Sequence, residues 1–265
     1  MIKLDLFPDG KRFAVTFSYD DGVIYDERLI EIFNKNGIKA TFNVNSGRIG
    51  SGGWFAENLD AYRGHEIACH GVSHASLAYL PTQNVYHEIF EDRLALEKRT
   101  GKHVFGLAYA NGSFSDTVIE TLKSCGICYA RAATSTMRYD LPTDFMRWDP
   151  TCHHRDSLTA AKHFMEKIVT TSYYSGKLLF IWGHSYEFDR DGNWELIEEV
   201  AEIVGNDERI YYATCGELYN YVTAQKRLEI SADNTLVHNP SAITVWFSKN
   251  GKPYEIKGGE TLKID

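Results

Sequence analysis

The stretch RFAVTFSYDDG, residues 12–22, joins an apolar run to a polar end. Residues 12–17 have the apolar and β-branched content of a buried strand. Asp20 and Asp21 follow, and Gly22 closes the stretch. Taken alone, an acidic pair before a glycine is also typical of a solvated turn. Two adjacent carboxylates behind a buried strand are nevertheless costly to hold together. We therefore interpret the stretch as a strand that leads into one half of a site.

Short apolar segments alternate with longer amphipathic segments along most of the chain. The expected strands are residues 12–17, 40–45, 65–69, 103–109, 127–131, 177–182 and 209–214, and the expected helices are residues 26–36, 54–62, 82–100, 115–125, 157–174, 193–204 and 217–226. This alternation is typical of βαβ units around a parallel sheet. A length of 265 residues is common among α/β barrels. The sequence therefore predicts an α/β fold of seven strands with helices between them.

The end of the chain has a different pattern. Residues 243–247 and 254–256 flank Asn250-Gly251, which is typical of a β-hairpin. A third apolar segment follows at residues 262–264. We therefore expect residues 1–226 to form the α/β domain and residues 227–265 to form a small β extension, whose role the sequence does not indicate.

The composition is that of a folded protein without a strongly charged partner. Hydrophobic residues make up 43% and charged residues 24%, which allows a substantial core. A formal net charge of -8, without a basic cluster, disfavours nucleic acid and anionic membranes as partners. No segment predicts a signal peptide or a membrane span, so we expect a cytoplasmic protein unless a leader has been removed. The oligomeric state is not indicated.

Five cysteines, an odd number, do not form the pattern of a disulfide framework. Cys125 and Cys128 make a CxxC motif, but the motif lies at the end of an expected helix. Redox cysteines draw their low pKa from a helix N-terminus. We therefore expect this pair to be buried packing, with a redox role as the alternative.

A second polar stretch, HGVSH at residues 70–74, follows the expected strand at residues 65–69. Two imidazoles four residues apart can face the same way if the segment forms a helical turn. Taken alone, the acidic pair is explained by a solvated turn and the two histidines by a helix surface. Together, Asp21, His70 and His74 make a typical set of metal ligands. Three such ligands leave coordination positions open, as in a catalytic metal site.

Several polar residues share one position relative to the expected strands, at or just after the end of each strand. They are Asp20, Asp21, His70, Tyr109 and His184. The carboxyl ends of parallel strands meet at one rim of an α/β barrel, where catalytic residues lie. The sequence therefore predicts that these residues meet at one site.

Three motifs resemble those of the polysaccharide deacetylase family of carbohydrate esterases, across residues 11–221. Residues 18–22 (SYDDG) are similar to the family's first motif, residues 70–74 to its second, and residues 181–184 (IWGH) to its last. The resemblance implies a distorted (β/α) barrel of about seven strands with a single metal site. The implied substrate is a carbohydrate.

The resemblance also implies a role for each motif residue. Asp20 would be the catalytic base, and His184 the general acid. Asp21, His70 and His74 would hold one divalent metal ion. Zinc is the metal we expect, although Co, Mn, Ni and Fe accept the same ligands.

Two departures from the family pattern concern the residues that orient the acid and the base. Residues 105–112 (FGLAYANG) lack the arginine that orients the base in the family's third motif. Tyr109 remains there, and the resemblance implies that its backbone N–H binds the oxyanion. Trp148 and Asp149 are the nearest match to the pair that sets the acid histidine, in reversed order.

Other polar clusters have simpler interpretations. Residues 187–191 carry three acidic side chains, which we interpret as a solvated turn rather than a second metal site. The long irregular stretch at residues 134–155 is expected to wall the site. His153 and His154 lie in it, and as neighbours in an extended loop they are expected to point apart.

The sequence thus favours a metal-dependent hydrolase that removes an acetyl group from an N-acetylated sugar or polysaccharide, using metal-activated water. An O-acetyl ester or a small cyclic amide is an alternative substrate. A non-haem iron oxygenase would use a similar triad, but the helix-rich pattern disfavours it. The missing arginine leaves open an inactive, carbohydrate-binding relative. Aromatic residues such as Trp54 can stack on sugar faces.

Overall fold

Eight parallel strands form the central sheet of the computed structural model, which describes residues 1–171 and 174–264. The sheet order is β6-β5-β4-β3-β2-β8-β7, and β9 also pairs with β2. The strands are β2 (Phe13–Asp21), β3 (Ala40–Val44), β4 (Glu66–Cys69), β5 (Gly106–Ala108), β6 (Tyr129–Arg131), β7 (Cys152–His153), β8 (Lys177–Gly183) and β9 (Ile210–Tyr212). A parallel bridge between Arg131 and Trp148 brings the segment before β7 beside β6, so the sheet curls toward closure. The predicted distorted α/β barrel is confirmed.

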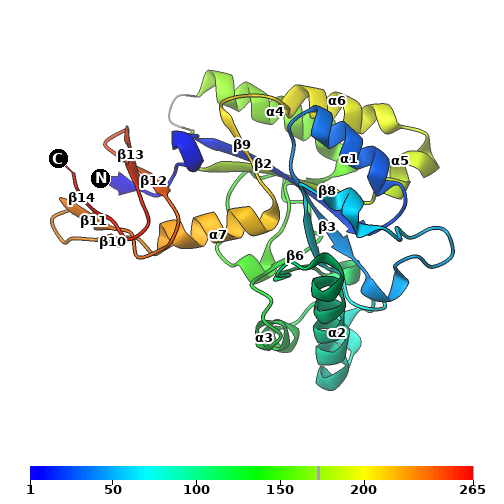
Figure 1. Ribbon diagram of the computed structural model, residues 1–265. Helices are drawn as coiled ribbons and strands as arrows, with labels where there is room; N and C mark the ends of the chain where they lie inside the picture. The colour runs from blue at the N-terminus through cyan, green and yellow to red at the C-terminus, as the bar shows by residue number, and fades with distance from the viewer. Residues whose placement is uncertain (172–173, 265) are drawn as a thin grey trace.

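The strand β2 is the centre of this sheet (Figure 1). It pairs with β8 from Phe13 to Tyr19 and with β3 from Phe17 to Asp21. The pairing with β3 continues to Asp21, so the two aspartates are the last strand residues and not part of a following turn. Their carboxylates are therefore fixed by the sheet itself.

Helices cover both sides of the sheet (Figure 1). They are α1 (Asp26–Lys35), α2 (Thr82–Thr100), α3 (Asp116–Ser124), α4 (Ser157–Thr170), α5 (Ser185–Asp191), α6 (Trp194–Val204) and α7 (Cys215–Lys226). In α1 the buried apolar side chains are Leu29, Ile30 and Phe33, spaced to form one apolar face. The long helix α2 has the predicted bounds and ends at Gly101 in the left-handed conformation.

The structure differs from several expectations on local structure. Residues 54–62 are helical only in the 3₁₀ turn η3 (Leu59–Tyr62), because a bridge between Val23 and Phe55 keeps the preceding segment extended. The segment after His184 is the helix α5 and not a turn. The stretch at residues 134–155 contains the short strand β7. The expected helix at residues 157–174 ends at Thr170, and residues 172–173 lie outside the described residues.

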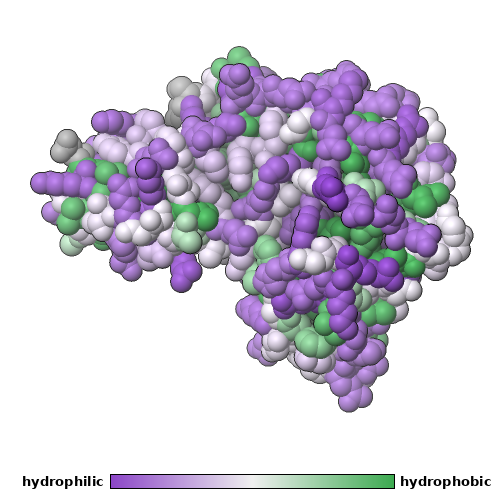
Figure 2. Space-filling view, in the orientation of Figure 1, coloured by the Kyte–Doolittle hydropathy of each residue, from purple (hydrophilic) through white to green (hydrophobic). Residues whose placement is uncertain are grey.

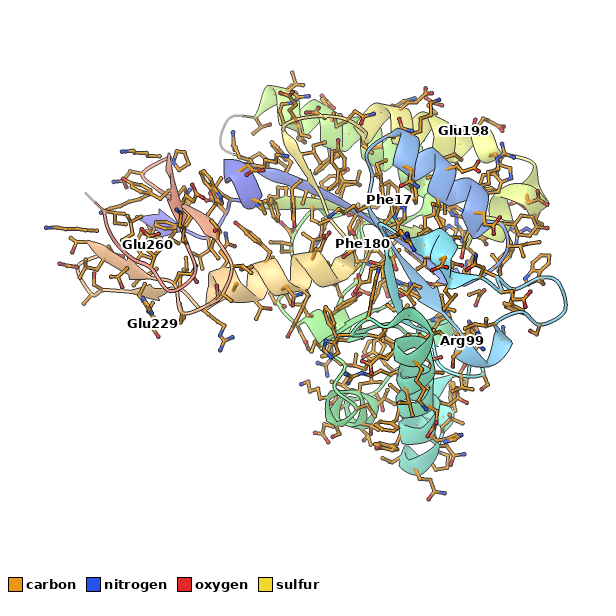
Figure 3. The ribbon with its side chains drawn as sticks, viewed as in Figure 1. Phe17, Arg99, Phe180, Glu198, Glu229 and Glu260 are labelled. Carbon is orange, nitrogen blue, oxygen red and sulfur yellow. The ribbon has the colours of Figure 1, made fainter. Side chains whose placement is uncertain are left out.

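Buried apolar side chains fill both sides of the sheet. Figure 3 shows Phe17 and Phe180 at the centre of the molecule, whereas Arg99 and Glu198 lie at its periphery. The ring of Phe17 lies 4.7 Å from that of Phe33 on α1. Full burial of one such side chain stabilises the fold by about 1.5–3 kcal/mol. The face drawn in Figure 2 is mostly hydrophilic, with hydrophobic residues in small separate patches.

A β region follows the last helix and contains two three-stranded sheets. Its strands are β10 (Glu229–Ile230), β11 (Leu236–His238), β12 (Val245–Lys249), β13 (Lys252–Ile256) and β14 (Thr261–Lys263). The predicted hairpin around Asn250 and Gly251 is present, and both residues have positive φ. The strand β1 (Ile2–Lys3) pairs with β12, so the start of the chain also joins this region. The proposed domain boundary at residue 226 stays a prediction.

Among the described residues, none of the helices combines the length and hydropathy needed to cross a membrane. All five cysteines are free thiols. Burial raises the pKa of Cys125, which disfavours the thiolate that redox chemistry needs.

Candidate metal centre and active site

Asp21, His70 and His74 converge at the carboxyl ends of β2 and β4. The Nε2 atoms of His74 and His70 lie 3.5 and 3.8 Å from Oδ1 of Asp21, and the three ligand atoms all lie within 4.8 Å of one another. Metal–ligand bonds of about 2.0–2.2 Å place neighbouring ligand atoms roughly 3–3.5 Å apart. The Nε2 of His70 and the Oδ1 of Asp21 are buried without a hydrogen-bond partner among the described residues. This donor set therefore fits a divalent cation.

The two histidines do not meet through the expected helical turn. Residues 70–74 are non-helical, and the chain reverses through Gly71 at φ +81° and His74 at φ +65°. Asp21 also has a positive φ of +79°. Such conformations cost about 1–3 kcal/mol at a non-glycine residue and cluster at functional sites. Two of the three candidate ligands are thus held in strained backbone positions.

Asp92 of α2 holds the backbone of this turn. Its carboxylate accepts hydrogen bonds from the N–H groups of His70 and Gly71, each at 3.0 Å, and from that of Ser46 at 2.8 Å. Burial raises the pKa of Asp92 to about 6. The Nδ1 of His70 donates to the carbonyl of Ala108 at 2.8 Å, which leaves Nε2 free to face the candidate site.

Asp20 is buried beside this donor set and is held by two donors. Asn43 donates to its Oδ1 at 2.8 Å, and Arg131 donates to its Oδ2 at 2.5 Å. Burial alone would raise the pKa of Asp20, but the positive charge of Arg131, with His70 and His184, outweighs burial and lowers it. Asp20 therefore remains a carboxylate.

Arg131 was missed by motif comparison. The expectation that this site lacks an arginine is wrong, because Arg131 enters from β6 rather than from residues 105–112. Its side chain is 1% exposed, and its guanidinium lies 4.5 Å from the ring of Trp182. The available signal was a charged residue at the carboxyl end of an apolar strand.

His184 has a carboxylate neighbour that sequence reasoning also missed. Its Nδ1 lies 3.5 Å from Oε2 of Glu187, and its Nε2 lies 4.0 Å from Oδ2 of Asp20. Burial alone would lower the pKa of His184, but Glu187 and the two aspartates outweigh burial and raise it. Asp149, the expected partner, is exposed, and Trp148 is buried against Phe180.

His153 and His154 do not point apart, because β7 and the turn after it direct both side chains toward α5. Their Nε2 atoms lie 3.0 and 3.1 Å from Oε2 of Glu187, which is therefore not part of a solvated turn. Arg155 donates to Nδ1 of His153 from both its backbone N–H and its Nε. A neutral His153 would therefore carry its proton on Nε2, the atom that faces Glu187.

Tyr109 does not have the expected free backbone donor. Its N–H donates to the carbonyl of Arg131 at 3.0 Å, and its hydroxyl donates to the carbonyl of Met146 at 2.9 Å. The side chain is 1% exposed. The prediction of Tyr109 as an oxyanion donor is contradicted by this geometry, which gives it a packing role.

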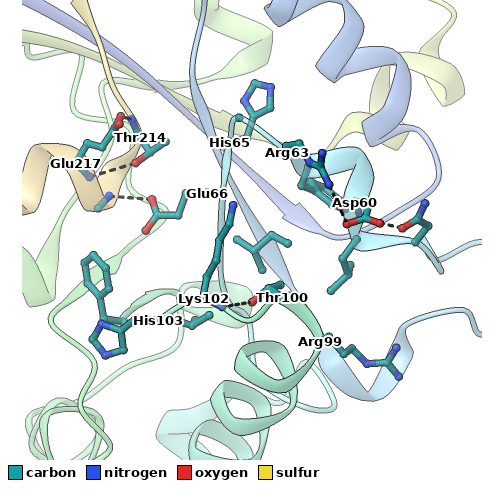
Figure 4. A pocket seen from close by; sticks show the side chains of 18 of the residues that line it. Asp60, Arg63, His65, Glu66, Arg99, Thr100, Lys102, His103, Thr214 and Glu217 are labelled. Atoms are coloured by element: carbon teal, nitrogen blue, oxygen red, sulfur yellow. Dashed lines mark hydrogen bonds and ion pairs between the residues drawn. The ribbon is translucent and has the colours of Figure 1, made fainter.

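A cavity of about 670 Å³ lies at the opposite end of the sheet (Figure 4). His65 and Glu66 line it at the start of β4, whereas His70 follows the end of that strand. His65 accepts a hydrogen bond from the Ala40 N–H, and Glu66 accepts from Thr41. Burial lowers the pKa of His65 to about 4. These polar groups are occupied in holding the fold, and chemistry in α/β barrels takes place at the other rim.

The sequence and the structure are both similar to those of known proteins. A polysaccharide deacetylase family model matches residues 8–130, which include Asp20 and the three candidate metal ligands Asp21, His70 and His74. The chain is 31% identical over 136 residues to a chitin deacetylase from Pestalotiopsis sp, covering 50% of this chain and 45% of that protein. It is 37% identical over 79 residues to a "Probable peptidoglycan-N-acetylglucosamine deacetylase" from Arthroderma benhamiae, covering 29% of this chain and 18% of the other.

The chain thus spans less than half the length of these curated relatives. The crystal structure of a "putative polysaccharide deacetylase" from Mycobacterium smegmatis superposes with a TM-score of 0.61 at 18% identity, covering 83% of this chain and 93% of that one. This match supports the barrel beyond residue 130. Residues 8–130 of the chain thus resemble the polysaccharide deacetylase family.

Proposed function

We propose that this protein is a metal-dependent hydrolase that removes an acetyl group from an N-acetylated sugar or polysaccharide. The observation that carries the proposal is the set of buried, unpartnered ligand atoms of Asp21 and His70 beside an ionised Asp20. The similarity to a chitin deacetylase and to a peptidoglycan-N-acetylglucosamine deacetylase supports the substrate class.

Asp21, His70 and His74 would hold one divalent ion, for which we propose zinc. A bound divalent ion polarises the acyl oxygen and lowers the pKa of water from 15.7 to about 7. Asp20 accepts the proton of the attacking water, since Arg131 keeps its carboxylate ionised. His184 then donates its proton to the leaving amine nitrogen, which is a very poor leaving group without it. The raised pKa of His184 favours the protonated form that this step needs.

Two competing hypotheses can be weighed against this site. An inactive relative was suggested by the arginine missing from residues 105–112, and Arg131 of β6 now supplies a guanidinium to Asp20. An iron oxygenase shares the ligand set, but the chain is a deacetylase-type α/β barrel. An O-acetyl ester would not need protonation of an amine, so comparing amides with esters distinguishes the remaining substrates.

Loss of either histidine ligand should abolish metal binding. We expect His70→Ala and His74→Ala to retain less than a tenth of the wild-type metal after dialysis, because each removes one of three ligands. Elemental analysis of the purified proteins measures this. His87→Ala, an exposed position on α2, is the control. Full metal content in both ligand variants would contradict the assignment.

Loss of the base should abolish turnover while the metal is retained. Asp20→Asn is expected to release acetate about 10²–10⁴ times more slowly, because it removes the proton acceptor. The assay uses N-acetylated and O-acetylated sugars, with Asp60→Asn, an exposed change, as the control. Equal acetate release by Asp20→Asn and the wild type would show that another group is the base.

Removal of Arg131 should shift the acidic limb of the pH profile. The base acts when deprotonated, so activity is lost as the pH falls through its pKa. Arg131→Gln removes the charge that lowers the pKa of Asp20, so the acidic limb of kcat/KM should move to higher pH. Arg131→Lys should move it less. Leaving Asp20 buried and unpaired should also cost about 3–5 kcal/mol of stability. An unchanged limb in folded Arg131→Gln would refute the role of this pair.

Removal of Glu187 should shift the alkaline limb. The acid acts when protonated, so activity is lost as the pH rises through its pKa. Glu187→Gln removes a contact that raises the pKa of His184, so the alkaline limb should move to lower pH. Asp191→Asn, exposed on the same helix, should leave the profile unchanged. If the alkaline limb shifts only in Asp191→Asn, or in neither variant, Glu187 does not raise the pKa of the acid.

A further inference from the structure

The loop between the 3₁₀ turns η2 (Ser46–Arg48) and η3 projects from the body of the molecule (Figure 1). The loop contains Gly52 and Gly53, both at positive φ, where an added Cβ would meet open space. Trp54 follows them and is 42% exposed. By contrast, Trp148 and Trp194 are buried. A large aromatic ring is therefore held at the surface by a turn that glycine makes possible.

This loop is tied to the segment that follows Asp21. The carbonyl of Trp54 accepts from the Ile24 N–H at 3.0 Å, and the Ala56 N–H donates to the carbonyl of Gly22 at 2.9 Å. An antiparallel bridge joins the residues between these two hydrogen bonds. Trp54 is thus placed relative to the candidate metal centre by backbone hydrogen bonds and not only by side-chain packing.

A row of rings leads from the proposed acid to this tryptophan. The ring of Tyr186 lies 5.2 Å from that of His184 and 5.9 Å from that of Trp54. Tyr25 packs edge-on against Trp54, 5.3 Å away at 73°. Burial and the negative charge of Asp21 raise the pKa of Tyr186, which agrees with its place beside the site. The row of rings therefore runs from the proposed acid His184 to Trp54 at the surface.

A single exposed aromatic residue needs no explanation, but this row is continuous with a catalytic candidate. The axial C–H groups of a pyranose ring make an apolar face, which packs on an aromatic ring while the sugar hydroxyls stay hydrated. The electron-rich face of tryptophan or tyrosine also attracts those C–H groups. A second acetamido sugar linked to the reacting one would need such a surface.

We propose that Trp54 and Tyr186 form a platform that stacks on the sugar unit next to the one being deacetylated, so that the site selects oligomers over single sugars. The proposal rests on the proposed function for its substrate class. It assigns Trp54 to binding and not to the chemical step. Removing the ring should therefore raise KM for an oligomer and leave kcat unchanged.

The test measures binding separately from turnover. A tetramer of β-1,4-linked N-acetylglucosamine and the single sugar are titrated into zinc-loaded Asp20→Asn protein, with and without Trp54→Ala, by calorimetry and by tryptophan fluorescence. One stacked ring contributes about 0.5–1.5 kcal/mol, so Kd for the tetramer should rise about three- to tenfold. Kd for the single sugar should not change. Trp54→Phe should retain most of the affinity, and Phe90→Ala, an exposed ring on α2, all of it.

The outcomes separate the two proposals. Loss of tetramer affinity in Trp54→Ala supports the platform even if the wild type releases no acetate, in which case only the proposed function fails. Equal tetramer affinity in Trp54→Ala and its parent, with an unchanged KM in the active protein, overturns the platform. Equal losses for tetramer and single sugar, or a tetramer that does not bind the parent, overturn it as well.

Discussion

The buried ion pair between Asp20 and Arg131 is the interaction on which the rest of the site depends. Two opposite charges buried away from water are stable only when they lie in close contact and when hydrogen bonds satisfy their remaining donor and acceptor atoms. Here the pair is supported by Asn43 on one side and by the ring of Trp182 on the other. Because its partners come from β2, β3, β6 and β8, the pair also requires that the sheet curl enough to bring its distant strands together.

The curl of the sheet places charged side chains in different surroundings at the carboxyl ends of the strands. Asp20 is neutralised by a permanent cation, whereas Asp21 faces two imidazoles and no guanidinium. Neighbouring residues of one strand therefore have opposite environments, one suited to a proton acceptor and the other to a metal ligand. On the far side, Oε2 of Glu187 lies 3.0, 3.1 and 3.5 Å from ring nitrogens of His153, His154 and His184. The proposed role of each residue, as acid, base or metal ligand, thus depends on which charged side chains the adjacent strands and helices place beside it.

Local pattern was enough to predict the parallel α/β fold, the bounds of α2 and the approach of Asp21 to both histidines. It failed where tertiary contacts decide. The turn at residues 70–74 depends on Asp92 from a distant helix, and residues 54–58 depend on pairing with the segment after Asp21. Arg131 and Glu187 replace groups expected elsewhere, and a motif comparison fixed to sequence order does not find a charge supplied by another strand or helix. The sequence could not show that the N–H of Tyr109 is already hydrogen-bonded to the carbonyl of Arg131, because that bond depends on the pairing of two strands.

The short strand β1 has a kinetic consequence. Ile2 pairs with Lys249, so nearly the whole chain separates two residues that share one sheet. Contacts of such long range close a large loop and form slowly. Residues 2–3 therefore stay unpaired until the distant strand β12 has formed. The pairing of β1 with β12 should accordingly be among the slow steps in the folding of the β region.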